Sequence, residues 1–497
     1  MHRSIVAALA ASTAFAVLPA VAADGTYFAA GAPLAVADLP AASPLRTDLE
    51  RLPVGPRAAA IARLQKLGFP AEDAATLRVD RTGHLFYADP VAGDPAHETA
   101  APASGTEAAA AAKANYTITA ANAFKLHSKP GASRKVYLNF RGATVTGTIW
   151  NSSVSSFKMK PYSEDADTTT FNASEIATIA EVWAGMSEDY APFDVDVTTE
   201  KPASFGPNVG HVLFSPRLDA NGNYIYGSSV GGVAYVDVWG LSDFKYYQPA
   251  LVFPEGVPGA KNMIEAGSHE LGHNLGLSHD GTSSVGYYSG HGSGLVSWAP
   301  IMGVGYYVNV SQWSKGEYSG ANNQEDDIAI ITGKLSAARD DHGNTGPTAT
   351  ALSVVSGKIT SKTPESDPFN PLSKVNRGVI GTRADVDVFK LSVPAAGTVS
   401  LVVTPAWRDT FRAQSLRNAD LDIRATLYRA NGNAIGAAVV ASAPAANTNA
   451  TLSARVTAGT YFLKIEGIGT GSVTGTGYSD YGSLGQYTIT GTVPTGG

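Results

Sequence analysis

The chain has 497 residues, too many for one ordinary hydrophobic core, because single domains usually contain about 100–200 residues. Its hydrophobic fraction of 44% and charged fraction of 16% are typical of a folded globular protein, and its 52 glycines and 28 prolines indicate many turns and a large β component. A formal net charge of −7 excludes a dominant basic surface, so neither nucleic acid nor an anionic membrane is expected as a partner.

The N-terminus predicts export. Residues 1–23 have a basic start, an alanine-rich apolar run and small residues at its end, which is the pattern of a cleavable signal peptide. A membrane anchor is the alternative, but it needs about 20 strongly apolar residues. No later stretch is apolar enough for stable membrane insertion, so we expect a secreted, extracellular protein. The chain has no cysteine, which removes thiolate from the candidate metal ligands and inhibitors.

Residues 24–115 are predicted to be a separable leader. One helix is expected around Arg57–Leu67, and one short strand at Gly83–Tyr87. The Ala-rich stretch Thr99–Lys113 is typical of a linker and would separate the leader from the next domain. A small independent domain is the alternative for the same composition.

Residues 130–337 are predicted to form an α+β domain, with a mixed twisted sheet and long helices. Its first strand begins near Lys135, where apolar and polar residues alternate. A long helix is expected behind a capping Ser174, and a shorter one over 322–335. Further strands are expected in the sequences FDVDVTTE, GHVLFSP and GGVAYVDVW. Only short alternating runs follow this domain, so residues 345–494 are predicted to be an all-β sandwich.

The sequence KNMIEAGSHELGHNLGLSHD has the spacing of a zinc site. His269 and His273 are four residues apart, so on a helix they lie on one face and can bind one ion. Gly276 tolerates a positive φ and can end the helix, which would return His279 to the same ion. Zinc accepts nitrogen ligands, and a catalytic zinc has three protein ligands and a fourth position for water. Glu270 lies about 100° around the helix from the first ligand and is predicted to take a proton from that water as general base.

The full pattern H-E-L-G-H-N-L-G-L-S-H resembles the zinc motif of the metzincin metallopeptidases. The resemblance implies that Met302, in APIMGVG, supports the metal site from beneath. Asp280, directly after the third histidine, resembles the adamalysin-like branch, where this residue is a structural partner within the domain. Some metzincins have a tyrosine two residues after the methionine. Here that position is Val304, and Tyr306 or Tyr307 would replace the tyrosine only with altered geometry.

A thermolysin-like site is the competing arrangement, and it needs a glutamate ligand on a second helix. No glutamate occurs between Glu270 and Glu317, and Glu317 lies in the turn-like sequence SKGEYSG. The competing arrangement therefore lacks its ligand. His291, in the glycine-rich sequence SGHGSG, is the nearest other histidine and is expected to be a loop residue.

Substrate contacts are predicted from the metzincin resemblance. The segment Gly231–Trp239 is expected to form the sheet edge to which a bound peptide adds as a strand. The segment between His279 and Met302 is expected to wall the pocket for the residue after the scissile bond. The candidate substrate-binding residues in these two segments are Gly232, Val233, Ala234, Tyr235, Tyr287, Tyr288 and Trp298. The last three would equally suit a hydrophobic core.

The C-terminal sequences DVDVFKLSV, LDIRATLY and AGTYFLKIEG resemble the bacterial pre-peptidase C-terminal domain, which accompanies secreted proteases. Asp385 and Asp387 are candidate Ca²⁺ ligands, although alternating acids at a strand start are more often only solvated. The leader resembles an inhibitory propeptide. Because the chain has no cysteine, the blocking group must be another residue, which the sequence does not identify.

These observations predict a secreted zinc endopeptidase, made as a zymogen, that hydrolyses internal peptide bonds of proteins or peptides. One alternative is a surface adhesin or binding protein with a vestigial zinc site. The intact Glu270 disfavours it, because a vestigial site need not keep the base. A second alternative is a zinc amidase that acts on cell-wall peptides.

Overall fold

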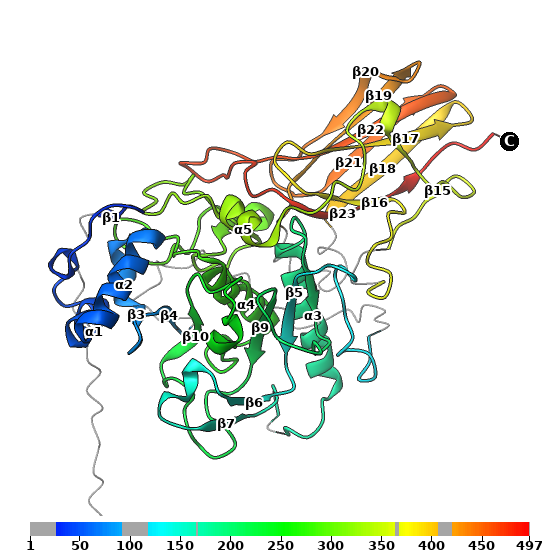
Figure 1. The fold of residues 1–497 in the computed structure, drawn as a ribbon. Coiled ribbons are helices and arrows are strands. Elements are labelled where there is room, and N and C mark those ends of the chain that lie inside the picture. The colour runs from blue at the N-terminus through cyan, green and yellow to red at the C-terminus, as the bar shows by residue number, and fades with distance from the viewer. Residues whose placement is uncertain (1–25, 92–117, 166, 363–366, 406–419, 497) are drawn as a thin grey trace, which may run out of the picture.

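A computed structural model describes residues 26–91, 118–165, 167–362, 367–405 and 420–496. The predicted signal peptide and the Ala-rich linker lie outside these residues. The described chain is a mixed α and β structure, in which a small N-terminal helical part and an elongated all-β domain flank a central sheet with helices (Figure 1). None of the described helices combines the length and the apolar character that crossing a bilayer requires.

A seven-stranded sheet forms the centre of the described structure. Its strand order is β3 (Leu77–Val79), β4 (Leu85–Pro90), β10 (Val230–Tyr235), β11 (Ala250–Val252), β9 (Val209–Phe214), β5 (Lys135–Asn139) and β8 (Asp196–Thr198). The four strands from β11 to β8 are parallel, whereas β10 is antiparallel to both β11 and β4. The leader therefore supplies two strands of this sheet and is not the separate unit that its composition suggested.

The leader also has a small core of its own. Helices α1 (Pro44–Arg51) and α2 (Val54–Leu67) bury Leu45, Leu49 and Leu64. The strand β1 (Tyr27–Phe28) pairs with β2 (Phe69–Pro70) beside them. This core includes Val236, which directly follows β10, so the leader packs against the central domain through side chains as well as through the sheet.

Two long helices pack on the central sheet and on each other: α3 (Ala173–Asp189) and α4 (Ala260–Leu275). The first helix begins two residues earlier than a Ser174 cap would place it. Asn172 is the capping residue, because its side chain accepts from the backbone N–H groups of Ser174 and Glu175, and Glu175 accepts from the Asn172 N–H in return. The shorter helix α5 (Asp327–Leu335) is capped by Asp326. Smaller pairs in this domain are β6 (Ala143–Thr146) with β7 (Ser156–Met159) and β12 (Trp298–Pro300) with β13 (Val310–Gln312).

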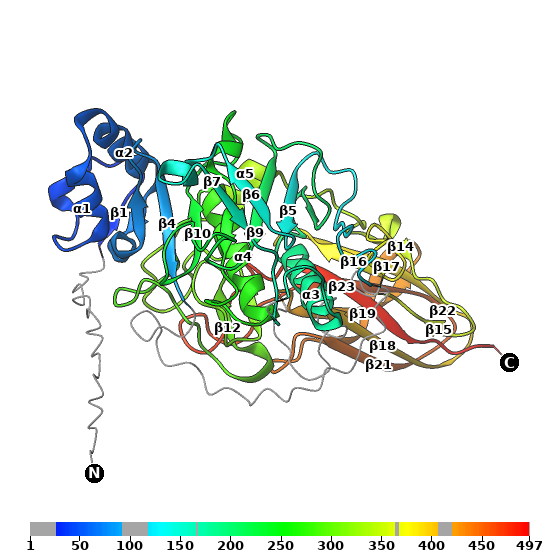
Figure 2. The same ribbon diagram turned by 90° about the horizontal axis from the view of Figure 1, so that it is seen from below.

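The C-terminal domain consists of two sheets with a hydrophobic core between them, as expected for an all-β sandwich (Figures 1 and 2). One sheet contains β14 (Thr350–Ala351), β17 (Val386–Val393), β22 (Gly459–Gly467), β19 (Ile423–Asn431) and β20 (Ala434–Ser442). The other contains β15 (Lys358–Ile359), β16 (Arg377–Ile380), β23 (Gly485–Thr492), β18 (Gly397–Pro405) and β21 (Ala450–Val456). The buried Glu188 of α3 accepts from the backbone N and from Nε2 of Gln486, at 2.8 and 2.9 Å, so the sandwich is bonded to the central domain.

The contact between α3 and α4 gives a stability prediction. A Cβ on Gly185 would lie 2.6 Å from Ile264 Cδ1, so Gly185→Ala should lower the free energy of unfolding by about 1–3 kcal/mol through overpacking. Gly333→Ala is the matched control, because Gly333 lies in α5 with open space around its Cα and should gain up to about 1 kcal/mol of helix propensity. Urea unfolding midpoints measure both changes. Equal midpoints for the two variants would contradict this close packing.

Candidate metal centre

The end of α4 brings three histidines together. His269 and His273 lie one turn apart on the helix, which ends at Gly276. This glycine has φ 111° and ψ 15°, and its N–H donates to the carbonyl groups of Gly272 and His273. Because only glycine adopts this left-handed conformation without strain, the chain can reverse here and return His279 to the helix.

Each of the three imidazoles has an acceptor for its Nδ1 hydrogen. The Nδ1 atoms of His269 and His273 lie 2.9 and 2.8 Å from the carbonyl oxygens of Ile301 and Leu277. The Nδ1 atom of His279 lies 3.3 Å from a carboxylate oxygen of Asp73, a leader residue. Carbonyl and carboxylate oxygens only accept, so each Nδ1 carries the hydrogen and each Nε2 keeps its lone pair. The three lone pairs are therefore available to one metal ion.

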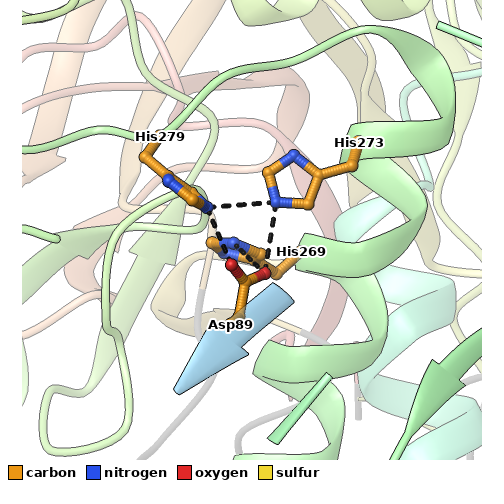
Figure 3. A group of neighbouring side chains, drawn as sticks. All are labelled: Asp89, His269, His273 and His279. Atoms are coloured by element: carbon orange, nitrogen blue, oxygen red, sulfur yellow. Dashed lines mark hydrogen bonds and ion pairs between the residues drawn. The ribbon is translucent and has the colours of Figure 1, made fainter. Parts of the chain in front are cut away.

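A fourth group faces these lone pairs, and it comes from the leader (Figure 3). Asp89 Oδ2 lies 3.3 Å from the Nε2 atoms of both His269 and His273, and Asp89 Oδ1 lies 3.2 Å from His279 Nε2. The Nε2 atoms of His273 and His279 are 3.2 Å apart. Four atoms about 2.0 Å from a tetrahedral zinc ion lie roughly 3.3 Å from one another. These four groups have the chemistry and the mutual spacing of a zinc site.

Charge also favours a cation at this position. Asp89, His273 and His279 are almost completely buried. Burial lowers the pKa of His273 to about 3 and so keeps it neutral. Burial also lowers the pKa of His279, but Asp73 and Asp89 outweigh this effect and raise the pKa to about 10. The two carboxylates thus require a positive charge among the imidazoles, and a divalent metal ion supplies it in place of a proton.

The two leader residues at this centre, Asp73 and Asp89, are not apparent from the sequence. Neither belongs to a recognisable motif, and both are far from the zinc motif along the chain. Asp89 reaches the histidines because β4 pairs with β10, which places Asp89 opposite Gly232. Tyr87, in the same strand, donates to Asp73 and stacks on His273 with ring centroids 4.1 Å apart.

Glu270 lies beside the three histidines and against β10. Its side chain is buried, and a Cβ on Gly232 would overlap its carboxylate, so this position requires glycine. Burial raises the pKa of Glu270, and the charge of Asp89 and a hydrogen bond with it raise the pKa further. A small cavity next to these groups is lined by Asp89, Pro90, Val91, Gly232, Ala266, His269, Glu270, Tyr287, Gly303, Val304 and Tyr306.

The residues expected to support the site lie beneath it. Met302 is fully buried, and its Sδ packs so closely on Gly272 of α4 that a Cβ there would lie 2.6 Å from the sulfur. The Asp280 N–H donates to the Met302 carbonyl at 2.9 Å, which ties the chain after the third histidine to the methionine. Burial and then Glu325 raise the pKa of the Asp280 carboxyl.

The predicted substrate-binding residues divide into two groups. Gly232 and Tyr287 line the cavity, and Val233 and Ala234 are buried in β10 beside them. Tyr235 packs into the core on Phe86, Trp150 and Tyr247. Tyr288 stacks on Tyr318, and Trp298 packs with Val310, Tyr318 and Tyr478. Tyr235 and Trp298 are buried and Tyr288 is partly buried, and none of the three lines the cavity beside the histidines. Their part in substrate binding stays a prediction.

The other candidate ligands lie elsewhere. His291 lies in the loop, where its Nδ1 is 2.8 Å from Tyr288 Oη and its Nε2 is 2.7 Å from the Gly477 carbonyl. Asp387 forms a group with Asp340 and Asp341 that has the spacing of a cation site, whereas Asp385 is outside that group. Binding of Ca²⁺ there stays a prediction.

Comparison with known proteins leaves the activity open. No protein-family model and no curated protein matches the chain. Among solved structures, the pre-peptidase C-terminal domain of a collagenase from Bacillus anthracis is similar over 31% of this chain and 97% of its own, with 11% identity and a TM-score of 0.16. A carbohydrate-binding module from Cellvibrio mixtus lichenase 5A is similar over 31% and 93%, with 11% identity and a TM-score of 0.16. A family 35 carbohydrate-binding module from Clostridium thermocellum is similar over 23% and 87%, with 14% identity and a TM-score of 0.12. Similarities this weak carry no functional argument.

The ligand geometry predicts that His279→Ala weakens zinc binding by at least about tenfold, because one of three lone pairs is removed. His291→Ala is the matched control, since His291 faces Tyr288 and Gly477 and not the centre. Zinc content after dialysis against a graded chelator series measures the change. Unchanged zinc affinity in the His279 variant would contradict the ligand assignment.

Proposed function

We propose that the protein is an exported zinc-dependent endopeptidase that is made in a latent form. The observation that carries the proposal is the buried set of three imidazoles with Glu270 and strand β10 beside them. When bound there, zinc supplies Lewis-acid activation of water and of a carbonyl group.

Glu270 is suited to act as the general base. It directly follows a metal-ligating histidine on α4 without being a ligand itself, so its carboxylate can accept a proton from water. The oxygen of that water forms a bond to the carbonyl carbon of the substrate, and the carbon–nitrogen bond then breaks. Glu270 passes the proton to the leaving nitrogen, so no covalent enzyme intermediate is required.

The edge of β10 is suited to bind the substrate chain. In the structure this edge pairs in antiparallel fashion with β4, which shows that it accepts an extended strand. A peptide that replaced β4 in the same register would place its backbone opposite Gly232, directly beside Glu270 and the histidines. Protein or peptide chains are therefore the substrates that this surface fits best.

The leader is suited to hold the enzyme latent through Asp89. Its carboxylate occupies the fourth position at the metal centre, and β4 covers the edge where a substrate would bind. Burial raises the pKa of Glu270, and the charge of Asp89 raises it further. A carboxylate thus performs the blocking role for which the chain has no cysteine.

The proposal predicts that Asp89→Ala raises casein hydrolysis by the uncleaved precursor at least about tenfold, because the fourth metal position becomes open to water. Zinc should stay bound through the three histidines but should pass faster to a chelator. Asp38→Ala, a change of an exposed leader carboxylate, is the matched control and should leave the precursor latent. If Asp89→Ala hydrolyses casein no faster than Asp38→Ala, then the pairing of β4 with β10, and not Asp89, keeps the precursor latent.

A second prediction concerns the base. After proteolytic removal of the leader, Glu270→Gln should keep stoichiometric zinc and lose at least about 10²-fold in the rate of casein hydrolysis, because the amide cannot accept the proton. Zinc content and initial rates are measured on the same samples. Casein hydrolysis at the wild-type rate would refute the proposed mechanism, and release of peptidoglycan fragments without casein hydrolysis would favour the cell-wall amidase.

A further inference from the structure

Tyr287 is the residue outside the zinc motif that contacts the centre most directly. Its hydroxyl donates to Asp89 Oδ1 at 2.7 Å, and this is the oxygen that lies 3.2 Å from His279 Nε2. The Tyr287 ring is buried against the His279 imidazole, with centroids 4.2 Å apart. The sequence suggested a position in the substrate pocket or in the hydrophobic core for this residue.

The Asp89 carboxylate marks where reacting atoms would lie. Like the tetrahedral intermediate of peptide hydrolysis, a carboxylate has two oxygens on one carbon, and both oxygens of Asp89 face the histidine nitrogens. Tyr287 donates to one oxygen of this carboxylate, and Glu270 lines the same small cavity. In the reaction these two oxygens correspond to the attacking water and the former carbonyl oxygen.

Building on the proposed function, we infer that Tyr287 is a catalytic residue. Its hydroxyl donates a hydrogen bond to the carbonyl oxygen of the substrate as negative charge develops there. No proton is transferred from Tyr287: the water loses its proton to Glu270, the oxygen–carbon bond forms, and the leaving nitrogen receives that proton when the carbon–nitrogen bond breaks. Donors aimed at the developing charge are among the largest contributors to catalysis by hydrolases.

The central domain holds the backbone that follows Tyr287. The N–H of the next residue, Tyr288, donates to the Asp280 carbonyl at 2.8 Å. The Val304 N–H donates to the Tyr288 carbonyl at 2.9 Å, which joins this segment to the chain after Met302. These backbone bonds do not involve the leader, so we expect the segment to keep its path when the leader is removed. The apolar Val304 supplies no side-chain donor at the position where some metzincins have a tyrosine.

The test compares Tyr287→Phe with Tyr288→Phe after removal of the leader. Both variants lose one hydroxyl, but that of Tyr288 faces His291, away from the centre. For Tyr287→Phe we expect kcat on a casein-derived peptide to fall about 10²–10³-fold, KM to stay within about threefold and zinc content to stay unchanged. A phosphinic analogue of the same peptide, measured by calorimetry in the Glu270→Gln background, should bind more weakly by a similar factor. Tyr288→Phe should change none of these quantities.

The outcomes separate this inference from the proposed function. If Glu270→Gln abolishes hydrolysis but Tyr287→Phe keeps the wild-type kcat and phosphinic affinity, the role of Tyr287 is overturned and the proposed function stands. If Glu270→Gln leaves hydrolysis unchanged, both are overturned. If Tyr287→Phe loses zinc or unfolds, Tyr287→His is measured in its place. A folded, zinc-loaded Tyr287→His variant with partial activity would support a hydrogen-bond donor at this position. An inactive one would overturn the inferred role of Tyr287.

Discussion

The metal centre places three imidazole nitrogens and one carboxylate together in a buried site. A cation among them makes this arrangement favourable. Without positive charge, burial of the carboxylate would carry a large desolvation cost. The pKa of His279 shows this need for positive charge. Burial lowers that pKa, but the two neighbouring carboxylates outweigh burial and raise it. In the proposed latent form, the metal would therefore matter as much as the strand pairing of the leader. Loss of the ion would leave a proton on His279 to balance the charge of Asp89, since the pKa of His279 is raised to about 10.

The surroundings of the centre make it rigid. Each ligating ring is fixed through its Nδ1 hydrogen, two of them by backbone carbonyl groups that remain after processing. His279 differs, because its acceptor is the leader carboxylate of Asp73. Removal of the leader would thus take away one metal-facing group and one supporting acceptor together. It would also expose the edge of β10, and a free sheet edge readily pairs with another chain.

The C-terminal sandwich is bonded to the central domain close to α4. Trp298 and Tyr478 pack in one cluster, and His291 meets the Gly477 carbonyl, so the sandwich supports the loop that carries Tyr287 and Tyr288. In the same interface, burial and then the charge of Glu265 raise the pKa of Asp189 to about 7, and Asp420 is a buried carboxyl near it. The pair is expected to hold a proton near neutral pH. The two domains are therefore coupled by buried polar groups as well as by apolar contact.

The sequence by itself determined the three histidines, Glu270 and the turn at Gly276, because helical spacing and a positive φ are local properties of neighbouring residues. It also determined most strands, because side chains alternate with a period of two. Only the tertiary structure decided that Asp73 and Asp89 meet these histidines, since that depends on the pairing of β4 with β10 across a long stretch of chain. Only the tertiary structure also distinguishes the role of Tyr287 from that of Tyr288. The two are adjacent and chemically identical, and only packing directs one hydroxyl to the metal centre and the other to His291.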